Sequence, residues 1–517
     1  MKLIQTHIIY TLTCLVLFGC VKDRGNYSEI AVPDLAIKSY SIYVNDKKLT
    51  AEQSANLLLN TNDNLKIEFE EDQINGITPT YQWMIYEVDP VLKPGSTPEA
   101  AQQIGTTKNL DQKFGKGPGK YKLFRKLINS NNNDAYFTEF NIIVESINGL
   151  LVYQVDGNGT GDYSMLRTSE MNLGLPEDRM GVRHAIYSSI NASHPIKNPS
   201  HLWIRQTGDA NYDDQIFAIS QQDWNQINYR THIWEHANKE SVFAFPLEGN
   251  FNPLGHMMGS NKLEYLIQNG EVYNIDYMTG PSTPKFIQLS ENGMFYSPYM
   301  MTIPTDMQTF RMYSNIVFNQ TLQRFEYDNF NYLMSFFPTQ GPLGGDDIDI
   351  SNTMMQLLYM EKGKDFSIGS VMKDNDGKIH FIRFDITDPM ASICSHHIDL
   401  SAMSNTAQDN SLWAISERGS FAFFATGNKV YLLNYEQQTI TPIVNDIPGD
   451  AQISALKILK DSSNPAYDNA ILYVIYNQGQ AGTLQQYEFN PLSGQLKGAS
   501  KKTFTGFNKI IDLIFKK

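Results

Sequence analysis

The stretch Phe421–Tyr435, FAFFATGNKVYLLNY, contains the pattern that decides the fold of most of this chain. Two runs of aromatic and aliphatic residues flank Gly427-Asn428, a dipeptide that suits a tight turn. A strand, a short polar turn and a second strand together predict an antiparallel hairpin. Units of the same kind recur from residue 150 onward, which indicates a repeat architecture.

Seven such units are visible, each with a turn rich in Gly, Asn or Asp. Their second strands are expected to begin near Tyr163, Gln215, Glu271, Arg324, Lys378, Lys429 and Thr483. Successive starts lie 51 to 56 residues apart, a period that fits a four-stranded propeller blade with generous loops. We therefore expect residues 148–517 to form a seven-bladed β-propeller.

The two ends of the repeat are expected to meet. Most units are preceded by a further strand, such as 183–187 or 453–458, but the first unit is not. The final run, Lys509–Phe515 (KIIDLIF), supplies one strand too many. We expect this C-terminal strand to complete the first blade, because pairing the ends removes the exposed edges of an open array.

Residues 30–147 show a different pattern, in which apolar and polar side chains alternate over short runs. These runs include 40–44, 65–69, 81–85 and 140–144. A period of two predicts antiparallel strands with one buried face. Trp83, followed by Tyr121, is similar to the core Trp and corner Tyr of immunoglobulin-like folds. We expect an all-β protein in which an immunoglobulin-like sandwich precedes the propeller.

The N-terminus predicts export and lipid attachment. Residues 1–19 combine Lys2 with a short apolar run, 8–18, which suits a secretory signal and is too short to span a bilayer stably. The segment ends in Leu17-Phe18-Gly19-Cys20. This ending resembles the lipobox of bacterial lipoproteins, so Cys20 is the expected lipid attachment site. Residues 20–29 would then link the anchor to the sandwich.

Charge and cysteine content limit the partners and the chemistry. The net charge of −14 argues against nucleic acid or an anionic membrane surface as a partner. Cys14 would leave with the signal and Cys20 would carry lipid, so Cys394 would be the one remaining thiol and no internal disulfide is expected. We expect Cys394 to be buried and inert, although His396 and His397 lie near it in sequence.

The segment Cys20–Tyr27, CVKDRGNY, resembles the mature start of the PKD-like family lipoproteins of Bacteroidetes. These proteins carry a Lys-Asp-basic-Gly-Asn-Tyr signature behind the cysteine, then a PKD-type sandwich and a longer C-terminal region. The resemblance covers this signature and the sandwich that contains Trp83. Over the propeller, the chain resembles these proteins only in layout. It implies an outer-membrane lipoprotein that acts with a TonB-dependent uptake system for glycans. It implies no catalytic residues.

Motifs for catalysis or metal binding are few. Gly157–Gly161 is glycine-rich, but no helix is expected after it, so a blade turn is favoured over a phosphate loop. Asp374–Gly377 (DNDG) resembles half a calcium loop, yet a hairpin turn explains it better. The acidic loop Gly344–Asp349 could also hold a hard cation, and a solvated loop is the simpler interpretation. Calcium is thus the candidate ion, and no cofactor is expected.

Turns between the second and third strands of each blade are expected to share one rim, where a ligand could bind. They carry Asn158, Asp162, Asp209, Asn211, Asp213, Asp214, Asn269, Asn319, Asp374, Asp376 and Asn428. Short carboxylates and amides bind sugar hydroxyls or cations, although turns also need them for backbone reasons. The tryptophans Trp203, Trp224, Trp234 and Trp413 are candidate stacking platforms. We select Asp209, Asp214, Trp224, Asp374 and Asp376 as the candidate binding residues.

Three functions fit these observations. The leading hypothesis is a non-enzymatic outer-membrane lipoprotein at the cell surface, which binds a polysaccharide or a protein of a TonB-dependent transporter complex. The first alternative is a propeller enzyme, a glycan hydrolase or lyase, whose carboxylates would converge from several blades without a local motif. The second alternative is a structural spacer. The periplasmic face of the outer membrane is the alternative location.

Overall fold

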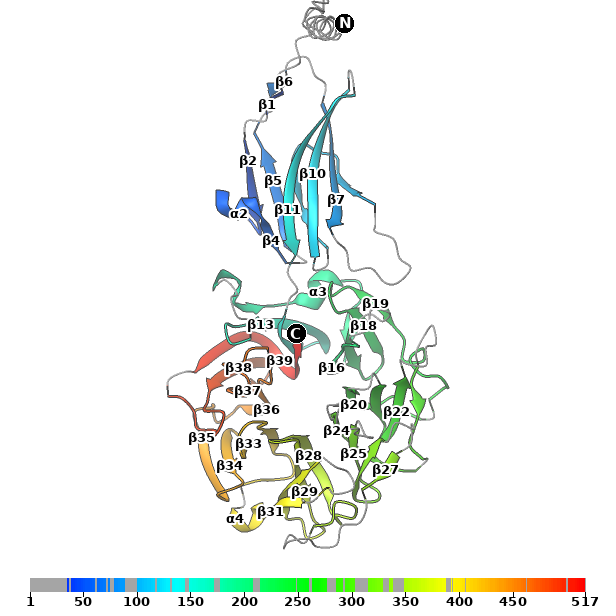
Figure 1. Ribbon diagram of the computed structural model, residues 1–517, viewed down its shortest axis with the longest axis vertical. Coiled ribbons are helices and arrows are strands. Elements are labelled where there is room, and N and C mark those ends of the chain that lie inside the picture. The colour runs from blue at the N-terminus through cyan, green and yellow to red at the C-terminus, as the bar shows by residue number, and fades with distance from the viewer. Residues whose placement is uncertain are drawn as a thin grey trace, which may run out of the picture. The chain divides into compact units, whose positions relative to one another are not determined.

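The computed structural model of the protein describes residues 35–516 apart from short internal stretches (Figure 1). These stretches are 37–38, 61–62, 71–72, 75–78, 89–99, 117–118, 131–132, 145–147, 172–176, 208–213, 248, 260–262, 277–284, 292, 303–314, 329–333, 338–347, 387–391, 393, 405, 462 and 499–500. The predicted signal and Cys20 lie outside the described residues. The fold is nearly all-β, with 58% strand and 4% helix, as the sequence predicts.

The chain divides into two compact units, which are described separately. Unit 1 comprises Met1–Val91 and Thr97–Glu145, and unit 2 comprises Leu92–Ser96 and Ser146–Lys517. Unit 1 contains a five-stranded sheet in the order β4 (Leu57–Leu59), β11 (Ala135–Val144), β10 (Gly119–Asn129), β7 (Pro79–Val88), β8 (Gln102–Gly105). Its four-stranded sheet has the order β3 (Lys47–Lys48), β2 (Tyr40–Val44), β5 (Asn64–Phe69), β9 (Leu110–Lys113). The pair β1 (Leu35–Ala36) and β6 (Gln73–Ile74) and the short helix α2 (Ala51–Ala55) complete this unit.

The two main sheets of unit 1 share one hydrophobic core. In β5 every second residue is buried, and these side chains pack with Trp83 and Phe140 of the five-stranded sheet. The Trp83 indole N–H donates to the carbonyl oxygen of Thr107 at 2.9 Å, so its polar atom is satisfied in the core. The alternation that predicts these strands therefore also predicts which face of each is buried.

Unit 2 contains five four-stranded antiparallel sheets, each made of four consecutive strands. The first two are β16 (Pro199–Arg205), β17 (Gln215–Ser220), β18 (Trp224–Asn228), β19 (Trp234–Ala237) and β20 (Pro253–Met258), β21 (Leu263–Gln268), β22 (Glu271–Asp276), β23 (Ile287–Gln288). The third is β24 (Tyr296–Thr302), β25 (Asn315–Asn319), β26 (Arg324–Asp328), β27 (Met334–Phe336). The last two are β28 (Gln356–Lys362), β29 (Ser367–Lys373), β30 (Ile379–Asp385), β31 (Cys394–Asp399) and β32 (Leu412–Ile415), β33 (Phe421–Thr426), β34 (Lys429–Asn434), β35 (Thr439–Val444).

The remaining strands of unit 2 form one eight-stranded sheet, which joins the two ends of the repeat. It contains β36 (Gln452–Ile458), β37 (Ile471–Gln478), β38 (Ala481–Glu488), β39 (Lys502–Lys516), β12 (Gly149–Val155), β13 (Thr160–Arg167), β14 (Gly181–Arg183) and β15 (Ile196–Lys197). The first part of β39 pairs with β38, and the second part pairs with β12 over 509–516. The predicted pairing of the C-terminal strand with the first unit is thus confirmed. Among the described residues, none of the sheets closes on itself.

The sheets of unit 2 follow one another around a common centre (Figure 1). The first strands of successive sheets contact each other in the order β16, β20, β24, β28, β32, β36, and β39 contacts both β36 and β16. Two hydrogen bonds fix β39 there. The Leu202 N–H donates to Asp512 Oδ2 at 2.9 Å, and Lys457 Nζ donates to the Leu513 carbonyl at 2.6 Å. Radially arranged four-stranded sheets are typical of a β-propeller.

One predicted unit is wrong by one strand. Residues 206–214 join β16 to β17, the first and second strands of their sheet, and not the second and third. The second-to-third turn is 221–223, which has no glycine. Both kinds of turn need residues that tolerate tight backbone geometry, so the glycine- and aspartate-rich stretch 207–214 imitates the pattern of the other units.

A second correction concerns the strand predicted over 183–187. Strand β14 ends at Arg183, and helix α3 (Ile186–Ile190) follows. Ala185 has φ of 55°, which turns the chain out of the sheet. Asp162 then holds the start of the helix, because its carboxylate accepts the N–H groups of Tyr187 (3.1 Å) and Ser188 (3.3 Å) and the Ser188 hydroxyl (2.5 Å). The apolar residues 186 and 187 are buried in this helix.

Candidate functional site

The selected acidic residues do not form one site. Asp209 lies outside the described residues. Asp214 is in the β16–β17 turn, where its Oδ1 accepts the N–H of Thr207 at 3.0 Å. Since strands β16, β17 and β18 are antiparallel, this turn lies at the end of the sheet opposite to the β17–β18 turn. The predicted shared rim therefore does not include Asp214.

Asp374 and Asp376 lie in the turn from β29 to β30. Asp374 Oδ1 accepts the N–H groups of Asp376 (3.0 Å) and Lys378 (2.8 Å), and Oδ2 lies 3.1 Å from His380 Nε2. Partial burial raises the pKa of the Asp374 carboxyl, but the bonds from His380 and the backbone outweigh it and lower the pKa overall. The carboxylate therefore serves the turn, which supports the hairpin interpretation of DNDG.

The histidines of the neighbouring strands continue from this turn. His380 Nδ1 lies 3.1 Å from Nε2 of His397, so Asp374, His380 and His397 form a hydrogen-bonded chain. His396 instead lies beside Glu436, with Nε2 3.4 Å from Oε2. Cys394 is free and buried, as expected. Within the described part of the chain, no group of three or more His, Cys, Asp or Glu side chains has the arrangement of a metal site.

Trp224 is not a stacking platform, which corrects the prediction. It is 1% exposed, and its ring packs against Phe217 and Phe286 with centroids 4.9 Å and 5.8 Å apart. The polar residues before it form the 221–223 turn, and Trp224 is the first residue of β18, on the buried side. Trp203 and Trp413 are also buried. Trp234 is half-buried and stacks on His194 at 3.8 Å.

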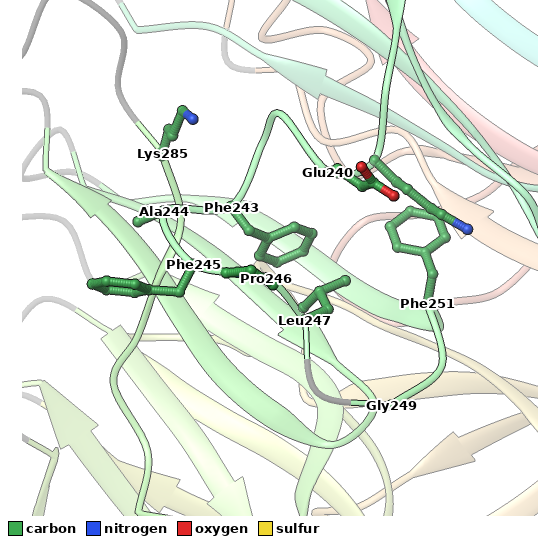
Figure 2. Close-up of a pocket in the computed structure, with 10 residues that line it drawn as sticks. Glu240, Phe243, Ala244, Phe245, Pro246, Leu247, Gly249, Phe251 and Lys285 are labelled. Atoms are coloured by element: carbon green, nitrogen blue, oxygen red, sulfur yellow. The ribbon is translucent and has the colours of Figure 1, made fainter.

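A pocket of about 370 Å³, which no pattern in the sequence predicts, lies in the connection between β19 and β20 (Figure 2). Its lining residues are Lys239, Glu240, Phe243, Ala244, Phe245, Pro246, Leu247, Gly249, Phe251 and Lys285. Figure 2 shows Phe243, Leu247 and Phe251 close together, with Phe245 on the far side from Phe251. Phe245 is 73% exposed, so its ring is accessible for contact with a ligand.

Main-chain hydrogen bonds fix the loop that builds this pocket. The Ala244 N–H donates to the Phe286 carbonyl at 2.9 Å, and the Phe286 N–H donates to the Val242 carbonyl at 2.8 Å. At the other end of the loop, the Gln268 amide bridges the backbone of 250 and 252. Phe243 anchors the floor, edge-on to Tyr273 at 5.4 Å. Both ends of the loop that lines the pocket, 242–244 and 250–252, are therefore held by neighbouring residues.

The chemistry of the pocket suits a sugar ring or another amphipathic small group. Aromatic faces pack against the C–H side of a pyranose, while charged groups at the edge exchange hydrogen bonds with hydroxyls. Lys239, Glu240 and Lys285 supply donors and acceptors at this edge, and Lys239 Nζ lies 5.8 Å from the Phe251 ring centroid. A volume of this order is at the small end of ligand pockets, enough for one or two sugar rings.

A second polar cluster joins three successive sheets. Lys460 Nζ lies 2.7 Å from Glu361 and 3.3 Å from Glu417, and Lys362 Nζ lies 2.8 Å from the other oxygen of Glu417. Glu361 also accepts the N–H of Ile415 at 2.7 Å. Because lysines neutralise both carboxylates, this cluster is suited to holding β28, β32 and the end of β36 together rather than to acid–base catalysis.

Within the part of the chain that the structure describes, no helix has the length and apolar composition needed to cross a membrane.

No family model and no curated protein matches the chain. Among solved structures it is similar to a quinonprotein alcohol dehydrogenase-like protein of Bacteroides thetaiotaomicron, at 13% identity and TM-score 0.44, over 92% of this chain and 99% of that one. It is also similar to the extracellular domain of a one-component system of the same organism (10%, 0.40, 76% and 54%) and to the Nup133 β-propeller domain of Vanderwaltozyma polyspora (12%, 0.33, 58% and 89%). Likenesses this distant carry no functional conclusion.

Proposed function

We propose that the chain is an outer-membrane lipoprotein, anchored through Cys20 at the cell surface, which captures a glycan without cleaving it. The lipobox-like ending at Cys20 and the signature that follows it support the proposed location. The resemblance to PKD-like lipoproteins supports a place beside a TonB-dependent transporter. The single observation that supports capture is the aromatic-lined pocket with its exposed Phe245.

In this proposal unit 2 is a seven-bladed propeller and unit 1 is an immunoglobulin- or PKD-like sandwich. Seven inner strands contact one another in sequence when β39 is counted between β36 and β16. Strand β39 would serve two blades, as the outermost strand of the last and the innermost strand of the first. The two sheets and shared core around Trp83 support the sandwich.

The experiment is a binding screen of the full-length protein in detergent against plant, host and microbial polysaccharides. Each polysaccharide is checked afterwards for new reducing ends. We expect saturable binding to at least one polymer, no cleavage, and loss of binding in Phe245→Ala. Leu492→Ala is the matched control, because Leu492 is equally exposed, at 73%, and does not line the pocket. Cleavage of any polymer would favour the enzyme alternative.

Lipid attachment and location at the cell surface are tested separately. Metabolic labelling with a fatty acid should modify the wild-type protein and not the Cys20→Ser variant, and protease added to intact cells should digest the wild-type protein. Labelling without surface digestion would place the protein on the periplasmic face. The absence of labelling would contradict the lipoprotein proposal.

A further inference from the structure

The outward face of the five-stranded sheet in unit 1 carries an aromatic diagonal. Opposite partners in a sheet share a face, and the register places Tyr86 opposite Lys122, Met84 opposite Phe124, and Phe137 opposite Lys126. Tyr86, Phe124 and Phe137 therefore lie on three adjacent strands and on one face. Their rings touch in sequence, with centroids 6.3 Å and 6.0 Å apart.

These rings are not part of the core. The core of unit 1 lies on the other face of the same strands, where Trp83, Leu123 and Phe140 are buried. Phe137 is 56% exposed, and Ile143 at the same face is also exposed. Tyr86 and Phe124 are partly exposed beside Phe137, so the three touching rings form an apolar strip with polar neighbours. Apolar patches with a polar rim are found at interaction sites. The diagonal is therefore a candidate binding surface.

Lysines surround the diagonal on the same face. Lys120, Lys122 and Lys126 alternate along β10 with buried residues, so all three side chains point outward with Phe124. Glu139 supplies one carboxylate there, and its Oε2 lies 3.2 Å from Lys122 Nζ. No carboxylate of the described residues forms an ion pair with Lys120 or Lys126. The face is thus cationic in a chain whose net charge is −14.

We infer that this face binds an acidic polysaccharide, with sugar rings stacked on Tyr86, Phe124 and Phe137 and carboxylates paired with the lysines. The three lysines span about 20 Å of strand, a length that fits several sugar rings rather than one. Single-stranded nucleic acid would meet the same kinds of group, and the net charge of −14 opposes both polyanions alike. The polysaccharide is favoured because the inference rests on the proposed glycan capture, and single-stranded DNA is therefore one arm of the test. The inference extends the proposed glycan capture to a second surface, independent of the Phe245 pocket.

The test uses polygalacturonate as the probe and the full-length protein in detergent. We expect saturable binding that weakens with salt and is absent for the methyl-esterified polymer, whose carboxylates are blocked. Phe137→Ala and the pair Lys122→Gln with Lys126→Gln should each weaken binding roughly tenfold or more. Glu139→Gln should strengthen it, because Lys122 is then released to the ligand. Unchanged far-UV circular dichroism and Tm would show that these exposed substitutions leave the fold intact.

The control pair is Lys48→Gln with Lys113→Gln, two exposed lysines on the other sheet of unit 1. These substitutions should leave the affinity unchanged, and so should Phe245→Ala. Equal binding of the esterified polymer, tighter binding of single-stranded DNA, or an equal loss in the control pair would overturn the inference. Loss in Phe245→Ala alone would overturn it as well, and would assign the polymer to the pocket. Failure of the pocket proposal alone would leave the response to Phe137→Ala intact.

Discussion

Lys516 is the residue whose surroundings depart furthest from those of an ordinary lysine. It is 2% exposed, and its Nζ lies 4.0 Å from the ring centroid of Tyr229. Burial, together with the charges of Arg230 and Arg167, lowers the pKa of Lys516 to about 7 against the opposing effect of Asp214. An uncharged lysine at the end of β39 is therefore compatible with the packing there.

This shift predicts a pH-dependent stability. Between pH 7 and 10.5 the unfolded chain holds a proton on Lys516 that the folded chain does not, so stability rises with pH by up to about 1.4 kcal/mol per unit. The Tm difference between the wild type and Lys516→Met should therefore increase in favour of the wild type between pH 7 and 10. The Tm difference between the wild type and the control Lys429→Met should not change over this range. A Tm difference between wild type and Lys516→Met that does not change with pH would contradict the shift.

The sequence predicted Asp374 and Asp376 correctly as turn residues, but it placed Asp162 and Asn319 in turns although they lie in β13 and β25, and it did not predict the pocket. Asp374 follows from local composition, because its bonds are made within four residues of chain and to the next strand. The prediction of Trp224 as a binding residue was wrong because its polar neighbours belong to the preceding turn. Only the strand register shows that its ring points inward. The Phe245 pocket depends on a loop held by residue 286, a long-range contact that leaves no local motif.

At the scale of elements, helix α3 depends on one carboxylate from another strand. Asp162 belongs to β13 and accepts two backbone N–H groups at the start of α3. Asp162→Ala should leave these donors unpaired and lower the unfolding free energy by about 1–3 kcal/mol. Asp162→Asn keeps an acceptor oxygen and should cost less. Thermal unfolding of both variants measures the difference, and equal Tm values for alanine and wild type would show that α3 is held by other contacts.

Element prediction from the sequence succeeded where strands are apolar and turns are short. The hairpin 421–435, with its two-residue turn, appears as β33 and β34, and β34 ends at Asn434, one residue before the predicted end. It failed at 206–214 because first-to-second and second-to-third turns share one composition, so only the pairing of β17 with β18 distinguishes them. It failed at 183–187 because a contact 25 residues away, from Asp162 to Tyr187, favours a helical turn over a strand.

At the scale of the whole molecule, β39 joins the ends of unit 2. The Asn477 side chain accepts the N–H of Ile510 at 2.8 Å and donates to its carbonyl at 2.9 Å, and the Asn508 N–H donates to Gln154 at 2.8 Å. Deleting 507–517 removes these bonds together with the pairing to β12. We expect global loss of the unit 2 fold, seen as rapid proteolysis and a lost unfolding transition.

Adding the deleted segment back as a peptide tests whether the loss of fold is due to the missing strand itself. A synthetic peptide of residues 507–517 added to the shortened chain should restore protection from protease in part, because it can pair again with β12. A shortened chain with an unchanged Tm would contradict the role of β39 as the element that joins the first and last sheets.

The most direct test of the central claim is calorimetric titration of full-length wild type and Phe245→Ala with the polysaccharide found in the screen. We expect saturable binding by the wild type, binding by the variant that is weaker by roughly tenfold or more, equal Tm values for the two proteins, and no new reducing ends. Equal affinities of the two proteins, or new reducing ends released from the polysaccharide by the wild type, would contradict glycan capture at this pocket.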